Sequence, residues 1–391
     1  MPFNPRTLRD DWNFPTTIYF GPGRITELAA ACRSVGIGRP LLVTDAGLAA
    51  LPIVKDAVAQ NMESGLPTVI FSEVQPNPVE SNVAAGVEAY RAGEHDGIIA
   101  MGGGSAMDTG KVIALMAGLD ASLFEYAGKW RQIPPEIIAP VVAVPTTAGT
   151  GSEVGRAAVI TRASTNTKTI IIHPGMMPSA VVADPALTLG LPPHLTAGTG
   201  MDALAHSLEA LCTPYCHPMA DGIAMEGMRL VREWLPEAFL SGGNLTARAY
   251  MLAAAMMGAT AFQKGLGAIH ALSHPVGAVY GTHHGLTNAI FMPYVLAFNR
   301  PALGDKMERL ARYLGLAGTG FDAILQWLLD LRSTLGIPHT LRDLGVPDDN
   351  FDTLAAMAAV DPCARDNPVP LGEDTLRQLL QDTYNGRLGV S

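Results

Sequence analysis

The chain has 391 residues, of which 48% are hydrophobic and 16% are charged. This length exceeds the usual size of a single core, so it predicts two domains, and the composition excludes a disordered protein. A formal net charge of −10 without any basic run argues against nucleic acid as a partner and favours small-molecule chemistry.

The first half of the chain alternates strand and helix patterns. Short apolar runs predict four buried parallel strands, at 40–45, 67–72, 96–103 and 140–147. Helical patterns lie between them, at 48–62, 80–93 and 105–118. This order predicts βαβ units and a Rossmann-like parallel sheet. Further strand patterns are expected at the margin of that sheet, at 16–21, 157–162, 167–172 and 179–185.

From about residue 195 the chain reads as one helix after another, with almost no strand pattern. The change from alternating strand and helix patterns to helix patterns alone lies near residues 185–190. We therefore expect an α/β domain over 1–187 and an all-α domain over 188–391.

A glycine-rich loop, GGGSAMDTGK, follows the third of the buried strands and opens a helix. Gly102, Gly103 and Gly104 allow close backbone approach, and the helix N-terminus offers free N–H groups to a phosphate. Ser105 is expected to cap the helix or contact phosphate, and Asp108 lies in the first turn. The pattern is not GxGxxG, and a tight turn without any ligand is the alternative.

A second polar loop, PTTAGTGSEVGR, follows the next strand, where Thr146, Thr147 and Ser152 can bind phosphate or ribose. Asp45 ends the strand at 40–45. A carboxylate there accepts hydrogen bonds from a ribose 2′-hydroxyl and repels a 2′-phosphate, which favours NAD over NADP. An Asx turn or a helix cap is the alternative role for Asp45.

Metal-binding side chains gather in two segments: Asp202 and His206 in GTGMDALAHSLEA, and His270, His274, His283 and His284 in GAIHALSHPVGAVYGTHHG. Residues four apart share one face of a helix. A carboxylate and imidazoles that converge from two segments suit a divalent metal. Spacing alone does not choose between His274, His283 and His284.

These two segments, with GGGSAMDTGK and PTTAGTGSE, resemble the iron-containing, group III alcohol dehydrogenases over essentially the whole chain. The resemblance implies the dehydroquinate synthase-like fold, with NAD(P) bound by the first domain and metal and substrate by the second. The implied metal ligands are Asp202, His206, His270 and His284. His274 is implied beside the metal, for proton relay or substrate orientation, and Lys168 is added to the expected NAD contacts.

The implied reaction interconverts a small primary alcohol or diol and its aldehyde, by hydride transfer to NAD with the metal as a Lewis acid. The resemblance favours Fe²⁺, with Zn²⁺ as the alternative, because this donor set suits either ion. An ω-hydroxy acid such as 4-hydroxybutyrate is the alternative substrate, with Lys264 or Arg156 receiving its carboxylate. Three less favoured functions are a maleylacetate reductase, a dehydroquinate synthase-like lyase and a non-catalytic nucleotide-binding protein.

The four scattered cysteines indicate reduced thiols, since their spacing does not form a zinc ribbon. The opening residues lack the pattern of a signal peptide, and apolar runs do not reach transmembrane length. We therefore expect a cytoplasmic enzyme with a small-molecule substrate, without a membrane partner. The resemblance implies a homo-oligomer, a dimer or larger.

Overall fold

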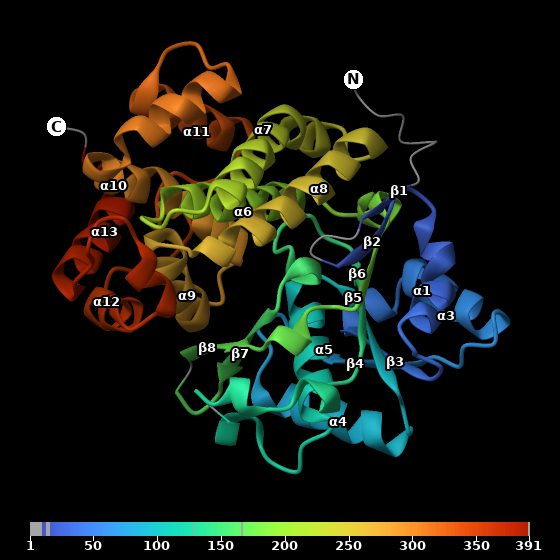
Figure 1. The fold of residues 1–391 in the computed structure, drawn as a ribbon. Helices are drawn as coiled ribbons and strands as arrows, with labels where there is room; N and C mark the ends of the chain where they lie inside the picture. Colours follow the sequence, from blue (N-terminus) through green and yellow to red (C-terminus); the bar gives the residue numbers. More distant parts are fainter. Residues whose placement is uncertain (1–9, 13–15, 127, 166, 390–391) are drawn as a thin grey trace. The chain divides into compact units, whose positions relative to one another are not determined.

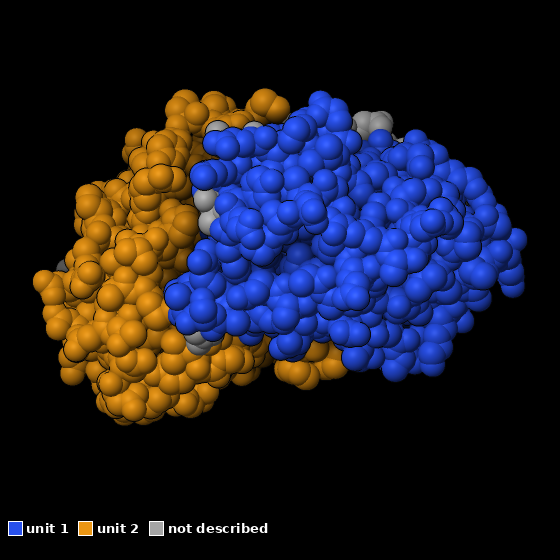
Figure 2. All heavy atoms as spheres, turned by 90° about the horizontal axis from the view of Figure 1, so that it is seen from below, with its two compact units in different colours: residues 1–190 blue, residues 191–391 orange. Residues whose placement is uncertain are grey.

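The computed structural model describes residues 10–12, 16–126, 128–165 and 167–389 (Figure 1). The chain divides into two compact units, residues 1–190 and 191–391, which Figure 2 shows in different colours. The opening segment that bears on a signal peptide lies mostly outside the described residues. Each helix in the described part of the chain is too short or too polar to span a lipid bilayer.

A seven-stranded sheet forms the centre of the first unit, in the order β1-β2-β9-β6-β5-β3-β4. In that order the strands are Asp10–Trp12, Thr17–Phe20, Ala180–Ala183, Val141–Pro145, Gly97–Gly102, Pro40–Asp45 and Val69–Val74. Neighbouring strands are parallel except β1 and β2, which are antiparallel. The parallel, Rossmann-like sheet predicted from the apolar runs is therefore confirmed.

The order of the strands locates a ligand edge on this sheet. From β3 the chain moves outward to β4, then returns to the other side of β3 as β5 and continues to β6. The sheet therefore has a switch point between β3 and β5, and ligands of open α/β sheets bind beyond the carboxyl ends of the strands at such a point. The loops after β3, β5 and β6 share that edge because these strands are parallel.

The helices of the first unit lie between the strands: α1 Leu28–Ser34, α2 Ala46–Ala49, α3 Pro52–Glu63, α4 Glu80–Ala92 and α5 Gly104–Met116. The predictions at 80–93 and 105–118 correspond to α4 and α5, whereas α1 was not predicted. The single helix predicted over 48–62 is wrong, because the structure has α2 and α3 there. Pro52 is the first residue of α3. Proline favours the first position of a helix and disfavours helical conformation in the residue before it, so the helix restarts at this point.

The strands expected at the margin of the sheet do not all lie there. β9 is an inner strand between β2 and β6, and its four residues are buried. β7 (Ala157–Arg162) and β8 (Thr167–Ile172) form a separate antiparallel pair. The apolar run of β9 has four residues, which is too short to distinguish an inner strand from an edge strand. β7 and β8 follow one another closely in the sequence, and such a short connection allows a local antiparallel hairpin.

The second unit is helical: α6 Pro193–Cys212, α7 Pro218–Leu240, α8 Leu245–Ala261, α9 Ala268–Tyr280, α10 His284–Leu314, α11 Gly320–Thr334, α12 Phe351–Ala359 and α13 Glu373–Asn385. Strands are absent among its described residues, 191–389. Nearly the whole of α6 is buried, and it packs against α7, α8 and α10. A helix that is buried on all sides is the centre of its bundle, so polar side chains on α6 point into the interior.

Candidate metal centre and dinucleotide site

The two glycine-rich loops of the first unit touch each other at the carboxyl edge of the sheet. The main-chain N–H of Thr146 donates to the carbonyl of Gly102 at 3.0 Å. Gly102 has φ of 149°, and a Cβ there would lie 2.8 Å from the Cβ of Ala106. A Cβ on Gly104 would lie 2.8 Å from Cγ2 of Thr150. The positive φ of Gly102 and the close approach of Ala106 therefore require glycine there, and glycine at 104 lets Thr150 of the second loop approach α5.

The start of α5 has the features of a phosphate site. Gly103 is the N-cap and supplies no side-chain cap, so N–H groups of the first turn remain for a ligand. Thr147 lies beside it, 3.4 Å from where a Cβ on Gly103 would be. The Ser105 hydroxyl donates to the carbonyl of Pro76 at 2.5 Å, and this bond fixes the first turn of the helix.

A buried lysine that was not among the predicted site residues joins the two loops. The Lys111 ammonium is fully buried and donates to Oγ of Ser152 at 2.6 Å and to the carbonyl of Gly155 at 3.2 Å. Asp108 accepts from the Ser152 hydroxyl at 2.5 Å through Oδ1 and from the N–H of Val159 at 2.8 Å through Oδ2. Asp108 and Ser152 are therefore part of a buried network that holds the second loop against α5.

Charge in this network shifts the pKa of two side chains. Burial lowers the pKa of Lys111, and the neighbouring Asp108 carboxylate opposes this effect. Burial raises the pKa of Glu153 to about 7. Neither carboxylate oxygen of Glu153 has a hydrogen-bond partner in the described part of the chain.

Asp45 and Lys168 lie in different settings. Oδ1 of Asp45 accepts from the N–H of Leu48 at 2.9 Å, so the helix-cap role that the sequence left open is observed. The same carboxylate lies at the end of β3, on the ligand edge, and contact with ribose stays a prediction. Lys168 lies in β8 opposite Thr161 of β7, in the separate hairpin.

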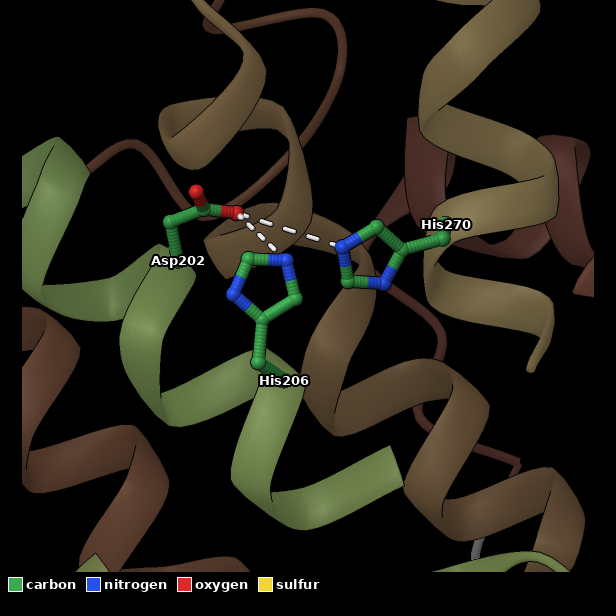
Figure 3. A group of neighbouring side chains, drawn as sticks. All are labelled: Asp202, His206 and His270. Atoms are coloured by element: carbon green, nitrogen blue, oxygen red, sulfur yellow. Dashed lines mark ion pairs between the residues drawn. The ribbon is translucent and has the colours of Figure 1, made fainter. Parts of the chain in front are cut away.

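Four predicted metal ligands meet in the second unit. Figure 3 shows three of them, Asp202, His206 and His270. Oδ1 of Asp202 lies 3.9 Å from Nε2 of His206 and 3.9 Å from Nε2 of His270. It lies 3.6 Å from Nε2 of His284, whose side chain is 29% exposed while the others are buried. Donors held at about 2.0–2.2 Å by one ion stand within roughly 4 Å of each other. The donor set and its spacing therefore fit one divalent cation.

Glycines allow the helices to converge on these donors. A Cβ on Gly285, which follows His284, would lie 2.1 Å from the carbonyl oxygen of Gly198 on α6. A Cβ on Gly258 of α8 would lie 3.1 Å from Cβ of His206. The His-Gly pair thus serves both functions, since the histidine supplies a donor and the glycine lets α10 approach α6.

Glu209, which was not predicted, orients one of the donors. Its Oε2 lies 2.6 Å from Nδ1 of His270, and its Oε1 accepts from the N–H of Ile269 at 2.7 Å. A carboxylate can only accept here, so Nδ1 carries the proton and Nε2 is left to face the site. Glu209 follows His206 by three residues on α6, so its helical spacing was a usable signal.

Burial and carboxylates act on His270 in opposite directions. Burial lowers the pKa of His270, but the hydrogen bond and the charge of Glu209, with the charge of Asp202, outweigh it, and the pKa is raised.

His274 has a carboxylate partner of its own. Its Nδ1 lies 2.8 Å from Oδ2 of Asp361, and its ring stacks on that of His284 with centroids 5.5 Å apart. Burial raises the pKa of Asp361, but His274 and the N–H of Cys363 outweigh it, and the pKa is lowered. Asp361 stands 87 residues from His274, and no local spacing could have indicated it.

Two side chains considered for the site have other roles in the structure. Nδ1 of His283 accepts from the N–H of Leu286 at 3.4 Å as the N-cap of α10. The buried ammonium of Lys264 donates to Asp221 and to the carbonyl of Leu211 at 3.4 Å, so it caps the end of α6. Arg156, the other candidate for a substrate carboxylate, is exposed and lies directly before β7.

Two sequence profiles match the chain along most of its length. The profile described as iron-containing alcohol dehydrogenase matches residues 15–185, and the C-terminal profile of the Fe-containing alcohol dehydrogenase family matches residues 196–384.

Individual proteins are similar over nearly their full length. A 4-hydroxybutyrate dehydrogenase of Cupriavidus necator is 41% identical over 383 residues, covering 94% of this chain and 98% of that protein. A crystal structure of 1,3-propanediol oxidoreductase has a TM-score of 0.90 at 35% identity, covering 96% of this chain and 100% of that one. A sulfoacetaldehyde reductase from Bifidobacterium kashiwanohense, solved in complex with NAD⁺, has a TM-score of 0.87 at 30% identity, covering 98% and 100%.

Proposed function

Because the chain belongs to the iron-containing alcohol dehydrogenase family and is therefore an oxidoreductase, we propose that it interconverts a small primary alcohol or diol and its aldehyde with NAD. The observation that carries this proposal is the cluster of Asp202, His206, His270 and His284, whose donor atoms converge as one divalent ion requires.

The second unit supplies the metal centre in this proposal, in the domain of residues 188–391 expected from the sequence. Asp202, His206, His270 and His284 would hold the ion, which is Fe²⁺ by family membership, with Zn²⁺ as the alternative. A bound ion supplies Lewis-acid chemistry, which polarises an alcohol or carbonyl oxygen.

Two side chains of the protein, His274 and Asp361, would transfer the proton of the alcohol. Asp361 engages Nδ1 of His274, so Nε2 of that ring is the atom that accepts a proton on alcohol oxidation and returns it on aldehyde reduction. The side chains of His274 and Asp361 are each 8% exposed, which limits the access of water to this pair.

The first unit supplies the NAD site, in the domain expected over residues 1–187. The N-terminus of α5, with Gly102, Gly103, Gly104 and Ser105, suits the pyrophosphate, and Thr146 and Thr147 lie beside it. Asp108 and Ser152 act here through the Lys111 network that fixes the second loop. Asp45 faces the ribose in this arrangement, and Lys168 adds a cation. The NAD⁺ complex of the sulfoacetaldehyde reductase supports this cofactor.

An ω-hydroxy acid is the second candidate substrate, and the similarity to a 4-hydroxybutyrate dehydrogenase favours it. Lys264 is an unsuitable receptor for a carboxylate because its ammonium already binds Asp221. The exposed Arg156 is the other cation that the sequence singled out.

NADH formation by anaerobically purified, Fe²⁺-loaded enzyme tests the proposal. The substrates are chain-length matched: 1-butanol, 1,4-butanediol and 4-hydroxybutyrate. We expect NADH to accumulate in proportion to alcohol consumed, with the neutral substrates preferred. A preference for 4-hydroxybutyrate would select the second candidate, and turnover without net NADH would identify a lyase instead.

Two further expectations concern the location and the oligomeric state of the enzyme. Ferrous iron and the free thiols both suit a reducing compartment, which supports the cytoplasmic location expected from the sequence. A homo-oligomer stays a prediction, which light scattering on the purified enzyme would test.

A further inference from the structure

A second cluster of metal-binding side chains lies in the helical unit. It consists of His274 on α9, Asp361, which follows α12, and Cys363 in the short 3₁₀ helix Pro362–Asp366. One donor atom of each residue lies within 4.8 Å of the donor atoms of the other two. The reaction proposed above uses His274 and Asp361 but leaves the thiol of Cys363 without a role.

The Asp361 carboxylate holds the cluster together. Its Oδ2 lies 2.8 Å from Nδ1 of His274, and its Oδ1 accepts from the main-chain N–H of Cys363 at 2.9 Å. The Cys363 thiol also forms a hydrogen bond with this carboxylate. Pro362 has a fixed φ and keeps the thiol-bearing residue close to Asp361. The imidazole and the thiol therefore both face one carboxylate.

The three side chains are nearly enclosed by protein. The side chains of His274 and Asp361 are each 8% exposed, and Cys363 is 6% exposed. Burial and the charge of Asp361 raise the pKa of the Cys363 thiol, so the thiol holds its proton until a cation replaces that proton.

The donor types favour a thiophilic divalent cation. Imidazole, carboxylate and thiolate are the side-chain ligands of zinc, and a site with three protein ligands leaves a fourth position open. The separation of the donors is close to the roughly 4 Å expected on one ion. A thiolate selects Zn²⁺ or Cd²⁺, whereas the cluster of Asp202, His206, His270 and His284 offers only oxygen and nitrogen.

We propose that His274, Asp361 and Cys363 form a second, inhibitory cation site for Zn²⁺ or Cd²⁺. The cation binds Nδ1 of His274, a carboxylate oxygen of Asp361 and the sulfur of Cys363, and the thiol proton is released.

Inhibition follows from the tautomer of His274. A neutral imidazole carries one N–H, so a cation on Nδ1 places the ring proton on Nε2. Nε2 then cannot accept the proton of the alcohol. This consequence rests on the proposed function, in which His274 accepts that proton, whereas binding of the cation does not.

The test is anaerobic titration of the Fe²⁺-loaded, full-length enzyme with Cd²⁺. Binding is followed by the ultraviolet charge-transfer band from thiolate to Cd²⁺, and inhibition by NADH formation. We expect the band to saturate at one Cd²⁺ per subunit while activity falls and the iron content is unchanged. Cys363→Ser should lose the band and require at least about tenfold more Cd²⁺ for half-inhibition, because even indirect partners of a metal ligand change affinity about 10–100-fold.

Matched variants separate this site from other thiols and from the proposed metal centre. Cys212→Ser replaces another buried thiol and Cys216→Ser an exposed one, and both should keep the band and the inhibition. Asp202→Ala should also keep the band, since Asp202 is not a donor of the second site. Cys363→Ala introduces no polar group and replaces Cys363→Ser if the serine variant does not fold.

Absence of the band, its persistence without Cys363, or its loss in Asp202→Ala would overturn the second site. Inhibition with loss of iron and without the band would also overturn it, because Cd²⁺ would then have displaced the ion of the proposed metal centre. Full activity at a saturated band would leave the cation site standing and overturn the proton-accepting role of His274.

Discussion

Glu209 ties the candidate metal centre to the start of α9. One of its oxygens accepts from Nδ1 of His270 at 2.6 Å, while the other accepts from the main-chain N–H of Ile269 at 2.7 Å. A single buried carboxylate thus fixes both the tautomer of a metal donor and the end of the helix that carries it. The orientation of His270 is therefore set by side chains of the protein.

Glu209→Gln should weaken metal binding about 10–100-fold, because loss of a carboxylate behind a histidine ligand has effects of this size. Chelator competition with Co²⁺ measures the change. Glu226→Gln is the control, since Glu226 binds Arg229 on α7 away from the donors. Equal Co²⁺ affinity in wild type and Glu209→Gln would show that His270 is oriented without this bond.

Asp361→Asn should slow turnover and leave metal content unchanged. Loss of the carboxylate removes the charge that holds His274 in position for proton transfer, a function that contributes about 10²–10⁴-fold in enzymes. His274→Ala should behave in the same way. The readouts are kcat and metal per subunit from the same preparation. If either variant loses its metal, His274 is a ligand and the proton role is wrong.

Glu209 and Asp361 differ in whether sequence spacing could have predicted them. Glu209 lies on the same helix as Asp202 and His206, at helical intervals from them. The periodicity that indicated these two donors could therefore also have indicated Glu209 as the residue that orients His270. Asp361 meets His274 across 87 residues of sequence. Only the packing of the segment after α12 against α9 creates that contact.

The same limit applies to the sheet. Apolar runs at 40–45 and 96–103 predicted β3 and β5 closely, because strands buried on both faces are continuously apolar. The place of β9 depends instead on pairing with β2 and β6, two strands that lie far apart in the sequence. The Lys111 network could not be predicted for a similar reason, since its acceptors come from a loop more than 40 residues away.

Asp45→Asn should relax discrimination against NADP. Asparagine is as good an N-cap as aspartate, so this variant keeps the start of α2 while it removes the charge that faces a 2′-phosphate. We expect the ratio of kcat/KM for NAD to that for NADP to fall at least about tenfold, or 1.4 kcal/mol. The ratio is measured with one alcohol at saturation. An unchanged ratio would leave Asp45 with its capping role alone.

Lys264→Met should lower stability without changing substrate preference. The Lys264 side chain is 1% exposed and bound to Asp221, whose side chain is 19% exposed. Removal of the ammonium leaves this partly exposed carboxylate unpaired, which costs about 1–3 kcal/mol. Thermal melting measures the loss, with Lys55→Met on the exposed side of α3 as the control. The rates on 1,4-butanediol and 4-hydroxybutyrate should keep their ratio. A selective loss with 4-hydroxybutyrate would show that Lys264 receives the carboxylate.

Glu153 makes stability depend on pH. Burial raises its pKa from the ordinary 4.5 to about 7. Below pH 4.5 the folded and unfolded states both hold the proton; between 4.5 and 7 only the folded state does. Stability contributed by this group is therefore lost as pH rises through that window, by about 3 kcal/mol at 1.36 kcal/mol per pH unit.

The glutamine in Glu153→Gln does not titrate. The free energy of unfolding of this variant, measured relative to that of wild type, should therefore rise by about 3 kcal/mol between pH 4.5 and pH 8. Urea unfolding at a series of pH values measures the difference. The exposed Glu136, changed to glutamine, serves as the control and should track wild type. A constant difference between Glu153→Gln and wild type across this range would mean that Glu153 is ionised in the folded enzyme, with the Lys111 ammonium as its counterion.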